Sequence, residues 1–254
     1  IVFLIIGTTG VLVRFIARKH GGKPLGIDDL LVFFAWVFSL ASMGLTICVV
    51  YYGAGRHRQY ILQTDPGDLK LFLRITYAFD IIYPCLAGSI KASICFLFLR
   101  LFDVSRAFRW HIYSLLTTIG LWTLGVLVIS LCQCKHFKGG VWNTNKGTCY
   151  NLRDILIDAS VAGPVFDVFI LVAPIQPLWY LKLSKWKKIQ VMVLFMLGVS
   201  EISVSIIRLN ELWTSKNSDI TWDYALHILW TTTETSIGLL CACCPVIGTL
   251  IPEL

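Results

Sequence analysis

The stretch Ile75–Leu99, ITYAFDIIYPCLAGSIKASICFLFL, decides the fold of this chain. Only two of its residues, Asp80 and Lys91, are charged. A helix that crosses a bilayer needs about 20 mainly apolar residues, and this stretch is long enough. It is therefore predicted to be a membrane-spanning helix that carries an acid and a base inside the membrane.

Six more apolar runs flank this stretch, and together they predict an all-α integral membrane bundle of seven transmembrane helices. The seven runs are Ile1–Ala17, Leu30–Tyr52, Ile75–Leu99, Ile112–Leu131, Ile155–Leu181, Ile189–Leu209 and Tyr224–Leu250. Hydrophobic residues make up 56% of the chain and charged residues 15%, against about 25% charged in soluble domains. We expect residues 1–254 to form a single domain. Because the first run has no initiator Met and no basic leader, we also expect the natural protein to continue beyond both ends.

Loop charge predicts the orientation of this bundle. The loops after the first, third and fifth runs hold ten Lys and Arg residues, against nine in the other loops, and Lys185–Lys188 is the densest cluster. The positive-inside rule then places the amino terminus outside and the carboxyl terminus in the cytosol. The net charge of +7 comes from short loops beside apolar runs, so we expect membrane lipid and not nucleic acid as a partner.

Three cysteines predict a disulfide on the outer side. Cys132, Cys134 and Cys149 lie in or beside the loop between the fourth and fifth runs, which the charge rule places outside. Disulfides persist on the oxidising side of a membrane. A Cys134–Cys149 bridge would stabilise the fold by roughly 3 kcal/mol on the chain-entropy model, and Cys132 is the alternative to Cys134.

Charges inside the runs point to the functional region, because each costs at least about 2.5–3.5 kcal/mol at membrane depth unless it is paired or wetted. The 1.5 Å helical rise sorts them into two layers. The outer layer holds Asp80, Arg208 and Asp158, and the inner layer holds Lys91, Asp167, Glu201 and Glu234. We predict that Lys91 pairs with Glu234, Asp167 or Glu201, and that Arg208 pairs with Asp80 or Asp158. Such layers serve helix packing, ligand binding and signalling, or ion and proton transport.

Several short motifs follow one another over nearly the whole chain. They are Asp28–Asp29, Tyr52-Gly53-Ala54-Gly55-Arg56-His57, Tyr83-Pro84, Lys91-Ala92-Ser93, Leu99-Arg100-Leu101-Phe102, Gln133-Cys134, Trp142, Gly147-Thr148-Cys149, Asp167, Pro174, Leu178-Trp179, Gly198, Ile206-Ile207-Arg208, Trp230, Glu234 and Cys244-Pro245. Each motif is weak alone, but in this order and spacing they resemble the fungal rhodopsin-domain family, the seven-helix receptor-like membrane proteins of filamentous fungi.

The resemblance implies a multi-pass protein of the fungal plasma membrane that senses a small ligand, with a heterotrimeric G protein as a candidate partner. Retinal is not expected, because its Schiff base needs a Lys, usually on the seventh helix, and Tyr224–Leu250 contains none. No other cofactor is expected. Two sequences that are familiar in G-protein-coupled receptors are absent: Asp/Glu-Arg-Tyr after the third run and Asn-Pro-x-x-Tyr in the seventh. The sequence therefore contains no such motif to indicate G-protein coupling.

Two other functional classes compete with the receptor. A channel or transporter would use the same buried Lys and carboxylate layers, although no matched pair of broken helices indicates an inverted-repeat carrier. A zinc hydrolase would need about three convergent ligands. The five His residues of the chain are scattered, mostly at predicted helix ends, so we expect neither a metal site nor an enzyme.

Overall fold

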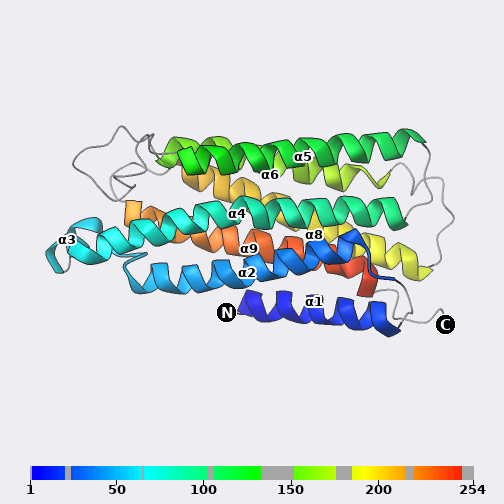
Figure 1. Cartoon of the computed structure of the whole chain (residues 1–254), viewed down its shortest axis with the longest axis horizontal. Coiled ribbons are helices and arrows are strands. Elements are labelled where there is room, and N and C mark those ends of the chain that lie inside the picture. Colours follow the sequence, from blue (N-terminus) through cyan, green and yellow to red (C-terminus); the bar gives the residue numbers. More distant parts are fainter. Residues whose placement is uncertain are drawn as a thin grey trace.

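The computed structural model is an elongated bundle of helices, and its described residues contain no β-strand (Figure 1). The structure describes residues 2–20, 24–64, 66–101, 106–132, 152–175, 185–214 and 220–247. Eight helices lie in these ranges: α1 (Val2–His20), α2 (Ile27–Tyr51), α3 (Arg58–Thr64), α4 (Pro66–Leu101), α5 (Arg106–Cys132), α6 (Leu152–Val172), α8 (Lys185–Thr214) and α9 (Ile220–Ile247). Each predicted apolar run overlaps one of these helices, whereas the short α3 was not predicted.

Four of the described helices are long and apolar enough to cross a membrane. They contain the segments Ile27–Tyr51, Gly67–Arg100, Arg106–Leu131 and Ile189–Thr214. Helix α1 is less apolar because Arg14 lies within it and its last turn is Arg18, Lys19 and His20. The described residues thus confirm an all-helical membrane protein.

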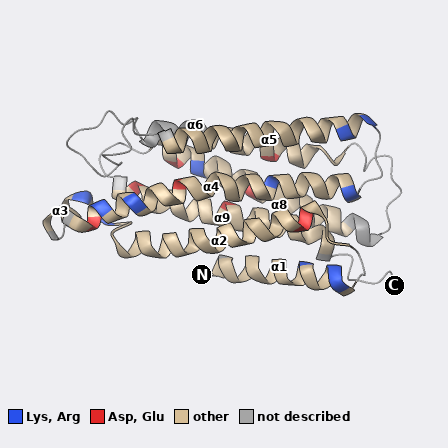
Figure 2. Ribbon diagram, in the orientation of Figure 1, with Lys and Arg blue, Asp and Glu red and all other residues tan. Residues whose placement is uncertain are grey.

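Polarity in this bundle is reversed relative to a soluble protein. Large apolar side chains face outward, such as Leu121 on α5 at 72% exposure and Met196 on α8 at 66%. Charged side chains, including Lys91 and Arg208, are buried between the helices. Figure 2 shows few charged segments along the middle of the helices and more towards their ends. An apolar outer surface, with the charged side chains buried between the helices, is the arrangement expected when lipid is the solvent.

Two apolar clusters fill the two halves of the bundle. The larger joins α4 to its neighbours through residues such as Leu86, Phe98, Ile112 and Leu239. The smaller lies nearer α3 and consists of Val49, Phe72, Phe79, Tyr224 and Ile228. Helix α4 contributes to both clusters and contacts α2, α5, α6 and α9. Together with α9 it is therefore central to the bundle, and side chains at different depths along it reach different partners.

The turn after α2 depends on two glycines with positive φ, +128° at Gly53 and +83° at Gly55. Residues that carry a Cβ atom rarely adopt such backbone angles. The turn brings the N–H of Gly55 to the carbonyl oxygen of Thr221 at 3.0 Å, and the Thr221 hydroxyl donates to the carbonyl of Arg56 at 2.7 Å. The α2–α3 connection is thereby attached to the start of α9.

Candidate functional site

Lys91 and Asp167 form an ion pair that joins α4 to α6 inside the bundle. The Lys91 ammonium donates to Oδ1 of Asp167, and the two residues are only 3% and 6% exposed. Asp167 was one of the three carboxylates predicted as partners of Lys91. Its second oxygen, Oδ2, is buried and has no hydrogen-bond partner.

Glu201 reaches the same region from α8 without a comparable partner. It is 6% exposed, and no hydrogen bond or ion pair to its carboxylate occurs among the described residues. The charged groups that act on it are Asp167, Lys91 and Glu234. A Cβ at Gly238 on α9 would lie 2.7 Å from Oε1 of Glu201. The glycine therefore leaves the space that the carboxylate occupies.

Arg208 pairs with Glu234 and joins α8 to α9. Nε of Arg208 lies 2.9 Å from Oε2 of Glu234, and both residues are almost fully buried. Ser205 donates to Oε1 of the same carboxylate at 2.9 Å, and the guanidinium lies 5.0 Å from the ring centroid of Tyr83. Glu234 thus has partners on α8, whereas Glu201 has none among the described residues.

The prediction that Arg208 pairs with Asp80 or Asp158 was wrong for Asp80, and the side chain of Asp158 lies outside the described residues. Asp80 instead accepts a 2.8 Å hydrogen bond from the Tyr224 hydroxyl. Helical rise gave each charge a depth but not the direction in which it points. Arg208 points towards α9 and reaches the acid that the prediction placed in the inner layer.

A pocket lies beside the Lys91–Asp167 pair, between α4, α6, α8 and α9. Its cavity volume is about 70 Å³, and the cavity is partly open to the outside of the bundle. Its wall is mainly apolar, and its carboxylates are those of Asp167 and Glu201. The lining includes Phe98, Gln190 and Pro245, near the ends of their helices. The pocket therefore occupies the half of the bundle that the charge rule assigns to the cytosolic side.

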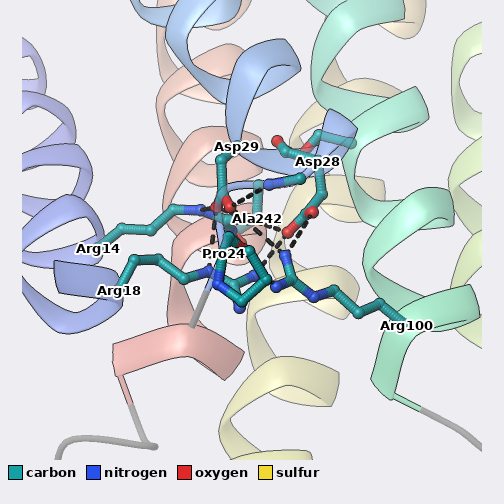
Figure 3. A network of polar contacts seen from close by, with 9 residues as sticks. Arg14, Arg18, Pro24, Asp28, Asp29, Arg100 and Ala242 are labelled. Atoms are coloured by element: carbon teal, nitrogen blue, oxygen red, sulfur yellow. Dashed lines mark hydrogen bonds and ion pairs between the residues drawn. The ribbon is translucent and has the colours of Figure 1, made fainter. Parts of the chain in front are cut away.

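A second buried polar cluster joins α1, α2 and α4, and we call it the arginine clamp (Figure 3). It consists of Arg14, Arg18, Asp28, Asp29 and Arg100. Figure 3 shows Arg14 and Arg18 reaching from α1, and Arg100 from α4, towards the two aspartates at the start of α2. Three cations around two carboxylates leave the cluster with one formal positive charge.

Arg14 is the most deeply buried member of the arginine clamp and links it to α9. It is 0% exposed; its Nε donates to Asp29 at 2.9 Å, and its Nη2 donates to Asp28 at 2.6 Å. Its Nη1 donates to the carbonyl oxygen of Ala242 at 2.5 Å, which links the clamp to α9. Asp29 also accepts from the N–H of Gly26 at 3.0 Å and so caps α2. The clamp thus holds the first turn of α2 against three other helices.

The arginine clamp was not predicted from the sequence. Asp28–Asp29 entered the prediction only as a family motif, and Arg14 was not counted among the embedded charges. The available signal was Arg14 itself, a cation inside the apolar run Ile1–Ala17. The predicted Cys134–Cys149 disulfide lies outside the described residues, and so does the side chain of its alternative, Cys132. No group of three potential metal ligands converges in the part of the chain that the structure describes.

Comparison with known proteins decides the family. The model of the fungal rhodopsin domain matches residues 13–253. The chain belongs to the fungal rhodopsin-domain family. The resemblance inferred from the short motifs is therefore confirmed.

This fungal rhodopsin domain is similar to three curated fungal proteins. The polyenoic acids biosynthesis gene cluster protein Ba17b of Metarhizium anisopliae is 25% identical, over 100% of this chain and 72% of that protein. An SAT4 family membrane protein of Emericella nidulans is 27% identical, over 81% of this chain and 52% of that protein. The receptor GIN3 of Arthrobotrys oligospora is 25% identical, over 85% of this chain and 54% of that protein. The chain spans only about half the length of the last two. No solved structure matches it.

The residues of this fungal rhodopsin domain do not fit a retinal site of the usual kind. Helix α9, Ile220–Ile247, contains no Lys that could form the Schiff base. Among the described residues, Lys91 is the buried Lys, and its ammonium is paired with Asp167. An amine held as a charged ion-pair donor is not free to act as a nucleophile.

Proposed function

We propose that this fungal rhodopsin domain is a receptor-like sensor that crosses the fungal plasma membrane seven times, with its amino terminus outside. Helices α1, α2, α4, α5, α6, α8 and α9 would be the crossing helices. The ligand would be a small molecule, and retinal would have no part. We propose no enzymatic activity. A heterotrimeric G protein would bind the cytosolic side, where Lys185–Lys188 lies in this orientation.

The position of the pocket carries this proposal. The two carboxylates that line it belong to different helices: Asp167 is on α6 and Glu201 is on α8. Each buried ion pair also joins two helices, α4 with α6 and α8 with α9. A ligand that binds a carboxylate here would favour one arrangement of these helices over another. A ligand shifts such an equilibrium only through differential contacts with the two states. The name of one relative, receptor GIN3, supports the same class.

The position of the pocket bears on the side from which the ligand would enter. A cell-surface receptor is ordinarily expected to take its ligand from outside. The pocket is instead near the ends of α4 and α9 and the start of α8, as the lining residues Phe98, Pro245 and Gln190 show. In the proposed orientation a ligand would reach it from the cytosolic half of the membrane.

The alternative is a channel or transporter that uses the same buried charges. Full-length protein in proteoliposomes distinguishes the two classes. If the domain is a receptor, nucleotide exchange by an added fungal G protein should be faster than exchange measured with protein-free liposomes. The measurement is made with and without culture-medium extract as a source of ligand. A receptor should also give no flux of protons or ions. Flux that the parent shows and a Lys91→Met variant lacks would reject the receptor proposal in favour of transport.

A further inference from the structure

The charges beside the pocket are unbalanced in one direction. Asp167 and Glu201 both line it, and Lys91 is the base that pairs with Asp167. Arg208, the next base, is paired with Glu234. The described residues around the pocket therefore supply one ammonium for two carboxylates.

Two buried oxygen groups at this site have no partner. Oδ2 of Asp167 is buried without a hydrogen bond. Glu201 is 94% buried, since it is 6% exposed, and makes no hydrogen bond or ion pair with a described residue. A buried carboxylate left in this state costs free energy unless a proton, a water molecule or a cation satisfies it. A ligand with a positive charge would supply what the site lacks.

The rest of the pocket favours an apolar body for that ligand. The wall beyond the carboxylates is formed mainly by aliphatic and aromatic side chains, including Phe98, Ile170, Leu194 and Phe195. Small-molecule sites of this kind combine an apolar wall with a few polar groups that fix orientation. An anion would be repelled by Glu201, and a sugar would leave most of its hydroxyl groups unpaired.

We propose that this pocket binds a lipophilic organic cation, whose ammonium group contacts Glu201 and Oδ2 of Asp167 and whose apolar body lies against Leu194 and Phe98. The inference rests on the proposed function only in treating the pocket as a ligand site. It names the class of ligand. Binding can be measured without any signalling partner, so the two proposals can fail separately.

The absence of a described partner for Glu201 leads us to expect a difference in affinity between an amine and a neutral compound. Glu201 is only 6% exposed in the folded chain, so a ligand cation gains a charge-assisted contact with little further burial of the carboxylate. We expect an amine to bind at least about tenfold more tightly than a neutral compound of the same shape, which is about 1.4 kcal/mol.

The test uses the full chain in lipid nanodiscs and two nearly isosteric probes, 1-adamantylamine and 1-adamantanol. Equilibrium binding of each is measured on the parent, on Glu201→Gln and on Glu211→Gln. Glutamine keeps the size of the side chain, and Glu201 has no described hydrogen bond to lose. Glu211 provides a matched control, because it lies on the same helix and does not line the pocket. Melting temperatures without a probe show that the variants are folded.

We expect saturable binding of the amine by the parent, at least tenfold weaker binding of the alcohol, loss of that preference in Glu201→Gln and its retention in Glu211→Gln. A Val191→Trp variant, which fills the pocket, should weaken binding of both probes. No saturable amine binding by the parent overturns the proposal, as does equal binding of the two probes. Retention of the preference in folded Glu201→Gln would overturn it too. Amine binding that leaves G-protein nucleotide exchange unchanged would support this inference while counting against the receptor.

Discussion

Replacing Arg14 by Met is expected to destabilise the fold more than any substitution at an exposed cation. The side chain of Arg14 is fully buried and contacts Asp28, Asp29 and the carbonyl oxygen of Ala242. Methionine fills similar space but supplies neither charge nor donors. The variant leaves two buried carboxylates, at 2% and 1% exposure, with only Arg18 and Arg100 as cations.

Two effects of different size compete in this prediction. An average interhelical hydrogen bond in a membrane protein contributes only about 0.6 kcal/mol, because the unfolded chain also finds partners there. Removing one member of a buried ion pair costs roughly 3–5 kcal/mol, because it leaves a buried charge uncompensated. Arg18 remains close to both aspartates, with contacts of 2.7 and 3.2 Å, so the lower end of the larger range applies. We expect a loss of about 3 kcal/mol.

Unfolding of the purified protein by a denaturing detergent, followed by tryptophan fluorescence, measures this loss. Arg109→Met is the matched control, since Arg109 is an exposed residue of α5, and it should change the unfolding free energy by less than about 0.5 kcal/mol. The double variant Arg14→Met with Asp29→Asn should lose less than the sum of the two single variants, because the paired charges are removed together. A loss below about 1 kcal/mol for Arg14→Met would refute the conclusion that the arginine clamp stabilises the bundle.

Three further predictions test other parts of the structure. Asp167→Asn should lower the unfolding free energy by about 3 kcal/mol because it leaves the Lys91 ammonium buried without its ion pair, and adding Lys91→Met should recover part of that loss in the same detergent titration. Gly53→Ala should destabilise the fold by about 1 kcal/mol or more and so lower the melting temperature, because a residue with a Cβ atom is strained at a φ of +128°. An unchanged melting temperature would contradict this. Mass spectrometry of the unreduced protein should find a Cys134–Cys149 disulfide, and free thiols at both positions would contradict that prediction.

The apolar runs predicted the helices well because the length and polarity of a membrane helix are local properties of the sequence. Ile75–Leu99 lies in α4 and makes up most of it, and Leu30–Tyr52 covers most of α2. The motifs also identified the family. The burial of Lys91 and Glu234 follows from the same reasoning, since charges in the middle of an apolar run must face the bundle interior.

Only the tertiary structure decided which charges meet. The partner of each charge depends on which helices are neighbours and how each helix is rotated about its axis. Neither property can be predicted from the sequence of one helix alone. Arg208 and Glu234 were assigned to different layers, yet they pair because α8 packs along α9 with these faces together. Arg14 lies only four residues before the cationic end of α1, Arg18 to His20, and its role appears only when α2 and α9 are placed beside it. Among the described residues, Glu201 likewise stood out as unpartnered only once the two nearby bases, Lys91 and Arg208, were seen to pair with other acids.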